Sequence, residues 1–484
     1  MILENIKKTG LALLLTTVVF SSCSEDVMDR INEDRNNPLT SPARFIITDA
    51  IASSAFKVAG SDYAFYASVY MENHVGIYGQ MYNAEIRTAE PYLSTTYDNA
   101  WSAAYTNLRN LKVAIDKCSP GGIEDGNFQA LGIAQVLSAY NLAIQTDLMG
   151  DIPWTEAIQP AIILQPKIDK QEAIYADVMK FLDDAIVNLG KNSAYASLEG
   201  QDLLYKGNNK AWVKMAHGLK ARYKMRLSFR SAKYQEVINE VDLSFAEASE
   251  QASFKFNGGT SNNPFYSFAN DRDYFGASTS LHEKLVARTD PRDALFFTSY
   301  PVAPNKPAKP LIFAPNGGPR QQQEYYGISG LLSASAPTHL LSYHELLFLK
   351  AEAYSRLGDK FNAEKALKAA IAAAFVKVGL TEEAAGTYYA DKVEGLFNAN
   401  PTKEIMAQKY LAFFEDEAVE SYNDYRRLKA MGNGDYIPLS NTKSFPLRFT
   451  YGSSDVTTND YVKAAYGDGQ YVKTENVWWA GGTR

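Results

Sequence analysis

The chain has 484 residues, of which 46% are hydrophobic and 21% charged, and its mean hydropathy is −0.27. This composition is typical of a globular protein with a large buried core. The formal net charge is −7 and no lysine- or arginine-rich run occurs, so nucleic acid is excluded as an expected partner. Two cysteines, Cys23 and Cys118, are too few for a disulfide framework or a zinc ribbon.

The amino terminus has the features of a secretory signal. Two lysines precede a short apolar run (residues 11–20), and two serines then lead directly to Cys23. The apolar run is too short to span a bilayer comfortably, and the order charged, apolar, small is that of a signal peptide. A cysteine at this point is similar to the lipobox of bacterial lipoproteins. We therefore expect residues 1–22 to be a lipoprotein signal peptide, Cys23 to carry the lipid and residues 23–42 to form a linker. An ordinary signal peptide with an incidental cysteine is the alternative.

The remainder, residues 43–484, is expected to form a single domain with four sections. Apolar residues recur three and four positions apart in residues 43–250 and 338–431, which predicts helices. Glycine and proline interrupt residues 251–337, so we expect a loop-rich insert there, and long loops in a domain are usually functional. The tail, residues 432–484, is also expected to be loop-rich.

One repeat unit can be recognised in the second helical section. Ala351, Ala363 and Ala370 fall where tetratricopeptide units need small residues for close helix approach, and Gly358-Asp359 supplies a turn. The predicted fold is therefore mainly α, a scaffold of tetratricopeptide-like helix pairs with a loop-rich face for a ligand.

Catalytic signatures are missing from the sequence. It contains no HExxH, no GxSxG, no phosphate-binding P-loop and no dinucleotide fingerprint. Residues 271–282 begin like a calcium loop, but Phe275 and His282 occupy ligand positions, so we expect no metal there. The densest acidic cluster, Glu415-Asp416-Glu417 with Glu420, is interpreted as ion pairs and a solvated helix face. We expect no catalytic residue, metal or cofactor. A secreted glycoside hydrolase stays open as an alternative because that chemistry needs only two carboxyl groups.

Short motifs spread over nearly the whole chain resemble, in the same order, those of the SusD/RagB family, and more closely those of its SusD-like second subgroup. They include a Gly-Asp-Ile-Pro turn, a Trp- and Arg-containing helix and an Asp-Pro-Arg triplet. The motifs are residues 31–38, 148–157, 212–226, 289–292, 341–353, 405–410, 425–427, 445–449 and 478–479. We interpret most of them as structural: the Gly-Asp-Ile-Pro turn ends a helix, and the arginines of the helix anchor buried ion pairs.

The resemblance implies a nutrient-binding lipoprotein, not an enzyme. Members of the family are outer-membrane lipoproteins that sit as a lid over a SusC-like TonB-dependent transporter and capture oligosaccharides, or peptides in some members. We therefore expect a lipid-anchored protein that faces the cell exterior and contacts the membrane through its anchor only. A helical-repeat scaffold for protein interactions is a further alternative.

Two stretches interleave aromatic and polar residues outside helical register, as a sugar-binding surface requires. One is residues 78–83 with Arg87, and the other is residues 270–275 with two later tyrosines. Ordinary packing is the alternative for each single residue. The candidate ligand-binding residues are Tyr78, Tyr82, Asn83, Arg87, Asp273, Tyr274, Tyr325 and Tyr326.

Overall fold

The computed structural model describes residues 41–88, 95–159, 162–302 and 307–484, and a folded unit runs from Ala43 to Arg484. The expected signal peptide and Cys23 lie outside the described residues. Within these described ranges, none of the helices combines the length and the apolar content that crossing a membrane requires.

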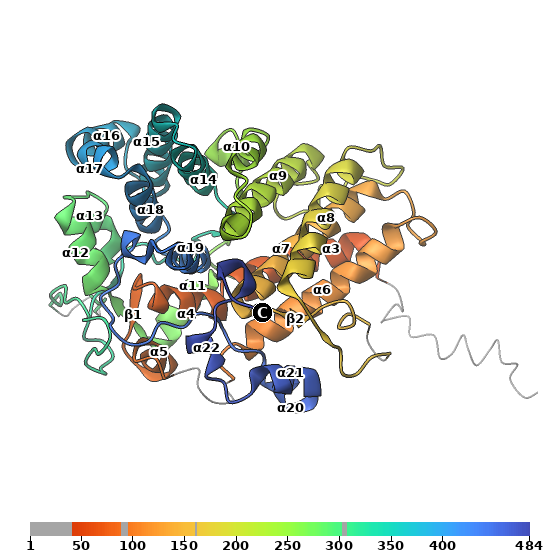
Figure 1. Cartoon of the computed structure of the whole chain (residues 1–484), viewed down its shortest axis with the longest axis horizontal. Helices are drawn as coiled ribbons and strands as arrows, with labels where there is room; N and C mark the ends of the chain where they lie inside the picture. The colour runs from red at the N-terminus through yellow and green to blue at the C-terminus, as the bar shows by residue number, and fades with distance from the viewer. Residues whose placement is uncertain (1–40, 89–94, 160–161, 303–306) are drawn as a thin grey trace, which may run out of the picture. The chain divides into compact units, whose positions relative to one another are not determined.

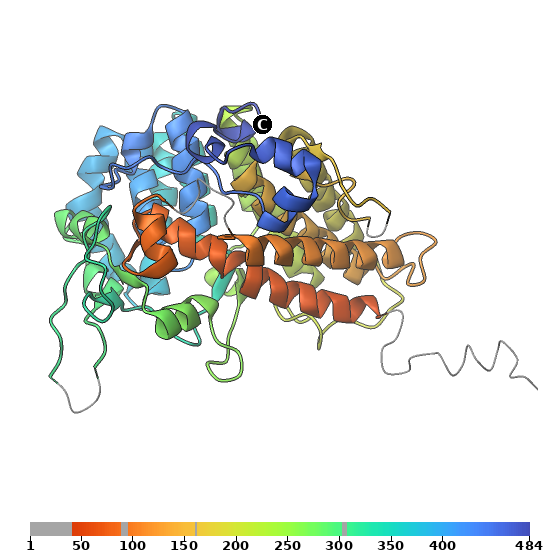
Figure 2. The same ribbon diagram turned by 90° about the horizontal axis from the view of Figure 1, so that it is seen from below.

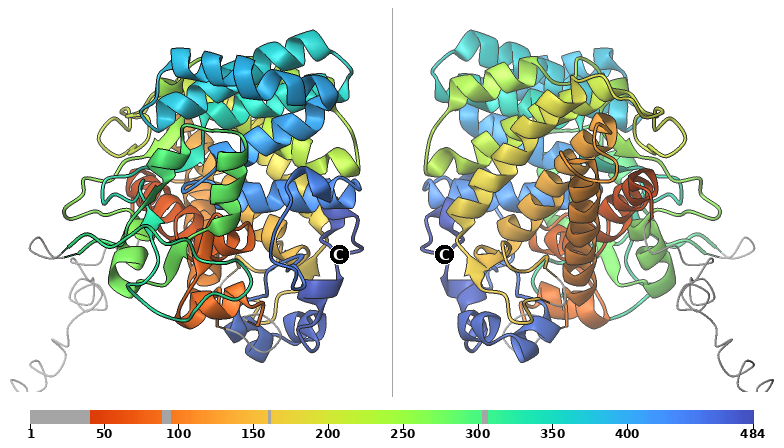
Figure 3. Two further views of the ribbon diagram at one scale, coloured as in Figure 1. Left: turned by 90° about the vertical axis from the view of Figure 1, so that its left-hand side faces the viewer. Right: turned by 90° about the vertical axis from the view of Figure 1, so that its right-hand side faces the viewer.

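Helices dominate the folded unit, and from α3 to α18 each long helix packs against the next long helix along the chain (Figure 1). The long helices are α3 (Ala43–Ser53), α6 (Asp98–Cys118), α7 (Phe128–Met149), α8 (Gln171–Leu189), α9 (Asn209–Arg226), α10 (Tyr234–Asp242), α14 (Tyr343–Arg356), α15 (Lys360–Lys377), α18 (Pro401–Ala412) and α19 (Ala418–Ala430). Figure 3 shows α6, α7 and α8 side by side in its right-hand view. The mainly α fold expected from the sequence is confirmed.

Helix α7 lies at the centre of this arrangement. Apolar residues occur on all of its sides, so it is buried around its whole circumference. It begins after Asn127, whose side chain accepts a hydrogen bond from the Ala130 N–H, and it ends at Gly150, where φ is +89°. A Cβ at Gly150 would lie 3.0 Å from Arg448 Nη1. The Gly-Asp-Ile-Pro motif therefore ends a helix, as the sequence predicts.

Helices α14 and α15 form the predicted repeat unit. Gly358 has φ of +81° in the turn between them, and the Asp359 side chain accepts a hydrogen bond from the Asn362 N–H at 3.0 Å to start α15. Ala351, Ala363 and Ala370 are fully buried in one hydrophobic cluster. Small side chains at these positions let the two helices approach closely.

The expected loop-rich insert contains helices as well as loops. Helix α11 (Pro264–Arg272) starts after Asn263 and α12 (Thr279–Ala287) after Ser278, and both of these side chains accept a hydrogen bond from the first helical turn. Apolar periodicity is hard to recognise over nine residues, and the prolines and glycines of the insert indicate loops. The sequence therefore did not predict these short helices.

Short elements complete the fold. The remaining helices and helical turns are η1 (Ser54–Ala59), α4 (Asp62–Tyr70), α5 (Gly79–Glu85), η2 (Leu227–Phe229), η3 (Ala248–Glu250), α13 (Asp293–Phe296), α16 (Glu382–Tyr388), η4 (Tyr389–Val393), α17 (Glu394–Ala399), η5 (Gly434–Tyr436), α20 (Ser453–Thr458), α21 (Asp460–Tyr466), α22 (Tyr471–Thr474) and η6 (Trp478–Ala480). The strands form antiparallel pairs: β1 (His74–Gly76) with β5 (Phe275–Ala277), β2 (Ile152–Pro153) with β3 (Ile168–Asp169), β4 (Ala252–Phe254) with β8 (Thr338–Leu341), and β6 (Phe297–Thr298) with β7 (Ile328–Ser329).

Buried ion pairs connect the long helices. Arg222 of α9 donates from Nε to a carboxylate oxygen of Glu345 of α14 at 2.7 Å. Arg427 of α19 donates to both carboxylate oxygens of Glu352 of α14, each at 2.7 Å. Burial by itself would raise the pKa of Glu352, but the Arg427 guanidinium holds that pKa below its usual value. The motif arginines thus anchor buried ion pairs, as expected.

The acidic cluster after α18 is more buried than the sequence predicts. Glu415 and Glu417 are buried in the loop before α19, and Glu417 pairs with His344 and Lys377. Glu420 pairs with Arg226. The expected ion pairs are therefore present, but the expected solvated helix face is wrong. The sequence could not show that cationic partners from α9, α14 and α15 lie beside these carboxylates.

We predict that Glu352→Leu lowers the free energy of unfolding by about 3–5 kcal/mol, because it leaves the Arg427 guanidinium buried without its bidentate partner. The double variant Glu352→Leu/Arg427→Met should recover most of this loss. Urea denaturation measures both values. Asp116→Asn is the control, since the Lys112–Asp116 pair is largely exposed and should change stability very little. A double variant as unstable as Glu352→Leu would contradict the prediction.

Candidate functional site

The two aromatic stretches singled out in the sequence lie next to each other. Strand β1 leads into the first stretch, and β5 begins at the last residue of the second. The two strands pair, so that Gly76 lies opposite Phe275. The Ile77 N–H then donates to the Tyr274 carbonyl at 2.9 Å. As a result, the Tyr78 and Tyr274 rings contact each other, with centroids 5.6 Å apart and planes tilted by 44°.

A glycine makes this ring contact possible. Gly79 has φ of +53°, and a Cβ at this position would lie only 2.7 Å from Tyr274 Cε2. The Tyr274 ring therefore lies directly against the backbone at the start of α5. Tyr78, which is 38% exposed, precedes α5, and Tyr82 and Asn83 follow within the helix as half-buried and exposed side chains.

Hydrogen bonds fix the end of α11 to the loop that carries Tyr325. Asp273 has φ of +50° and accepts the Glu324 N–H on its carboxylate. Burial raises the pKa of the Asp273 carboxyl, while this backbone hydrogen bond acts in the opposite direction. Gln323 donates to the Arg272 carbonyl at 2.6 Å. The half-buried Tyr325 is thereby held beside the second stretch.

Two candidate residues lie inside the fold. Arg87 is 3% exposed, and its guanidinium lies 4.8 Å from the centroid of the Tyr70 ring and 5.7 Å from that of Phe445. Tyr326 is 4% exposed and accepts the Arg320 N–H on its hydroxyl at 2.8 Å. Both side chains hold the surrounding loops in place in this structure and do not reach its surface. Sequence does not separate a surface arginine from one stacked between aromatic rings.

The other six candidates are exposed or half-buried, and we call them the tyrosine face: Tyr78, Tyr82, Asn83, Asp273, Tyr274 and Tyr325. Further polar side chains border the tyrosine face, and they were not among the candidates predicted from the sequence. The Arg320 guanidinium lies 5.0 Å from the centroid of the Tyr325 ring, and Lys309 pairs with Glu324 at 3.6 Å. The run of polar residues just before Tyr325 is the feature of the sequence that could have indicated these bordering side chains.

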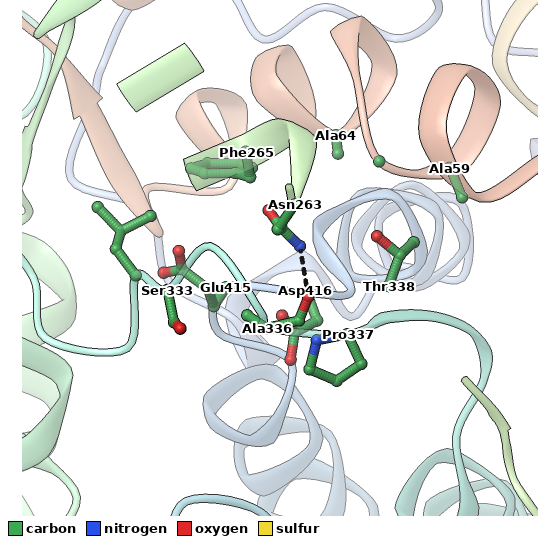
Figure 4. Close-up of a pocket in the computed structure, with 12 residues that line it drawn as sticks. Ala59, Ala64, Asn263, Phe265, Ser333, Ala336, Pro337, Thr338, Glu415 and Asp416 are labelled. Carbon is green, nitrogen blue, oxygen red and sulfur yellow. Dashed lines mark hydrogen bonds between the residues drawn. The ribbon is translucent and has the colours of Figure 1, made fainter. Parts of the chain in front are cut away.

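A small cavity, shown in Figure 4, contains part of the acidic cluster. Glu415 and Asp416 line it together with Asn263 and Thr338, and its volume is about 20 Å³. Neither carboxylate oxygen of Glu415 has a hydrogen-bond partner, and the nearer one lies 3.4 Å from His74 Nε2. The space fits a single water molecule, whereas a glycosidase must place its two carboxyl groups on either side of a sugar bond.

Metal-binding side chains do not cluster in the part of the chain that the structure describes. No three or more His, Cys, Asp or Glu residues within it are arranged to hold a metal ion. The lone Cys118 is buried, and burial raises the pKa of its thiol to about 12. Burial thus disfavours the thiolate, which is the reactive form of a cysteine.

The chain is similar to a known protein family and to several solved structures. A family model described as starch-binding and associating with the outer membrane matches residues 35–452. A solved SusD/RagB family protein from Bacteroides thetaiotaomicron VPI-5482 is 44% identical, with a TM-score of 0.86 over 92% of this chain and 100% of that one. A chitin-binding SusD homologue from Flavobacterium johnsoniae is 20% identical, with a TM-score of 0.70 over 90% and 98% of the two chains. Curated protein sequences give no match.

We predict that Gly79→Ala displaces the Tyr274 ring, because the new methyl group would overlap it. Gly121→Ala is the matched control: Gly121 has φ of +84°, but nothing lies within 4 Å of its added Cβ. Both variants should lose about 1–2 kcal/mol of stability from the positive φ. Crystal structures of the two variants check the difference, and an unmoved Tyr274 ring in Gly79→Ala would refute it.

Proposed function

The chain belongs to the SusD-like family of starch-binding proteins that associate with the outer membrane, and from this premise we propose that it captures an oligosaccharide at the cell surface and delivers it to a SusC-like TonB-dependent transporter. The observation that carries the proposal is the Tyr78–Tyr274 ring pair, which is formed by two stretches far apart in the sequence. A peptide is the second candidate ligand because the same surface suits apolar side chains.

The chemistry of the tyrosine face supports sugar capture. The C–H faces of a sugar pack on aromatic rings, and its hydroxyl groups need nearby donors and acceptors such as Asn83 and Asp273. Each aromatic contact contributes roughly 0.5–1.5 kcal/mol, so the four tyrosines of this face provide a few kcal/mol in total. A dissociation constant of 1 mM corresponds to about −4 kcal/mol. We therefore expect weak, reversible binding, which suits a protein that must release its ligand to a transporter.

We predict that Tyr78→Ala/Tyr82→Ala/Tyr274→Ala abolishes oligosaccharide binding without unfolding the protein. The triple variant removes the rings but leaves the α5 backbone and the β1–β5 pairing intact. Isothermal titration against a glycan pool measures the effect. Tyr195→Ala/Tyr461→Ala is the control, since these tyrosines are 40% and 47% exposed at other places on the chain. Unchanged affinity in the triple variant would exclude the tyrosine face as the site.

The same pools separate the competing functions. Saturable binding without products supports capture, whereas cleaved glycans or peptides would indicate a secreted hydrolase. If the protein neither binds nor cleaves any member of the pools, this result would favour a scaffold for protein interactions. A peptide that binds in place of every glycan would change the ligand class but keep the capture function.

Anchoring is the second part of the proposal. We expect Cys23 to carry acyl chains that hold the mature protein on the outer membrane, facing the exterior, because two or more chains bind a bilayer stably. Cys23→Ser should then abolish incorporation of labelled palmitate and release the protein from membrane pellets. An unacylated wild-type protein that is free in the periplasm would refute the anchor.

A further inference from the structure

The guanidinium group of Arg320 borders the tyrosine face and has no hydrogen-bond partner of its own. It lies 5.0 Å from the centroid of the ring of Tyr325, which packs against the buried cluster that contains Ile77. Arg320 is exposed, and in the part of the chain that the structure describes its guanidinium forms neither a hydrogen bond nor an ion pair. A guanidinium carries five N–H donors, so this one is available to a ligand.

Hydrogen bonds fix the segment that carries this guanidinium. The Gly317 N–H donates to the Glu85 carboxylate, and the Lys443 ammonium donates to the Gly317 carbonyl. The Arg320 N–H donates to the Tyr326 hydroxyl at 2.8 Å. Stacking on an aromatic ring restricts the side chain in addition, because the flat guanidinium lies against the ring. The group is therefore positioned before a ligand arrives, which lowers the entropy cost of binding.

The acidic residue next to Tyr325 in the sequence, Glu324, already has a cationic partner. Lys309 pairs with Glu324 at 3.6 Å, and its ammonium lies 4.8 Å from the centroid of the Tyr300 ring. Figure 2 shows the two segments that carry Tyr300 and Lys309, in green and teal, projecting side by side from the left of the fold. This projection supplies the lysine that balances Glu324. The stacked guanidinium therefore keeps its charge for a ligand.

The other charged side chains at this border leave a small positive excess. Asp273 accepts the Glu324 N–H, and burial raises the pKa of its carboxyl, so its negative charge is disfavoured. Asp271 and Arg272 are both exposed and have opposite charges, so together they add no net charge. Lys443, on the Gly317 carbonyl, adds a further positive charge. A border of this kind attracts an anion and repels a cation.

We propose that the ligand of the tyrosine face is an acidic oligosaccharide, and that a uronic-acid carboxylate of this ligand binds the Arg320 guanidinium. The inference rests on the proposed capture function and names the ligand class. A planar carboxylate accepts two parallel hydrogen bonds from the planar guanidinium fork, and such charge-assisted pairs are stronger than neutral hydrogen bonds. Neighbouring sugar units of the same chain pack on the tyrosine rings. A neutral sugar offers hydroxyl groups only, so it gains less from this guanidinium.

The test compares ligands that differ only in the carboxylate. Trigalacturonic acid and its trimethyl ester form one pair, and hyaluronan tetrasaccharide and its dimethyl ester form the other. Isothermal titration should show at least about tenfold tighter binding of the acid within one pair or both, as expected for a hydrogen bond between charged groups. This preference should shrink in about 1 M NaCl, where the Debye length is only about 3 Å.

Two variants locate the preference. Arg320→Gln removes the charge and the fork, so the ratio of the acid and ester affinities should fall to about one. Arg44→Gln is the matched control and should leave the ratio unchanged. The Arg44 guanidinium also lies over an exposed ring, 4.8 Å from the centroid of Phe45, but on α3, which is on the opposite side of the fold from α5 (Figures 1 and 2). Both arginines are exposed, so both variants should keep the wild-type melting temperature.

Two results would overturn the inference and leave sugar capture standing. One is binding of neutral glycans together with equal affinity for acid and ester in both pairs. The other is an acid preference that survives Arg320→Gln, because the carboxylate would then bind elsewhere. If no glycan of any kind binds, the proposed function itself fails and this inference fails with it, so the two failures can be told apart.

Discussion

Buried charge pairing between helices is the constraint on which the rest of this structure depends. Arg226 of α9 contacts Asp147 of α7 and Glu420 of α19, while Arg427 joins α19 to Glu352 of α14. Each of these guanidinium groups has been removed from water and is stable only with its carboxylates in place. Helices that are far apart in the sequence are thus held in one arrangement, and apolar packing alone would specify that arrangement less strictly.

A second set of buried carboxylates accepts hydrogen bonds from backbone segments around the tyrosine face. Glu85, in α5, accepts the Gly76 N–H at 3.2 Å and also the Gly317 N–H, and burial raises its pKa to about 7 despite the nearby Arg87. Glu72 accepts the N–H groups of Ser440 and Asn441 at 2.9 and 2.6 Å. These carboxylates connect the β1 region to the insert and to the C-terminal tail. Hydrogen bonds from backbone N–H groups to these buried carboxyl groups therefore connect the segments around the tyrosine face.

The sequence by itself determined the helical class, the α14–α15 repeat and the turn at Gly150, because apolar spacing, small residues and glycine act locally along the chain. It also selected the two aromatic stretches. Only the tertiary structure decided that β1 and β5 pair and bring Tyr78 against Tyr274, that Arg87 and Tyr326 turn inward, and that Glu415 and Glu417 are buried. The physical reason is that burial and charge pairing depend on neighbours from distant segments, and a local pattern does not contain those neighbours.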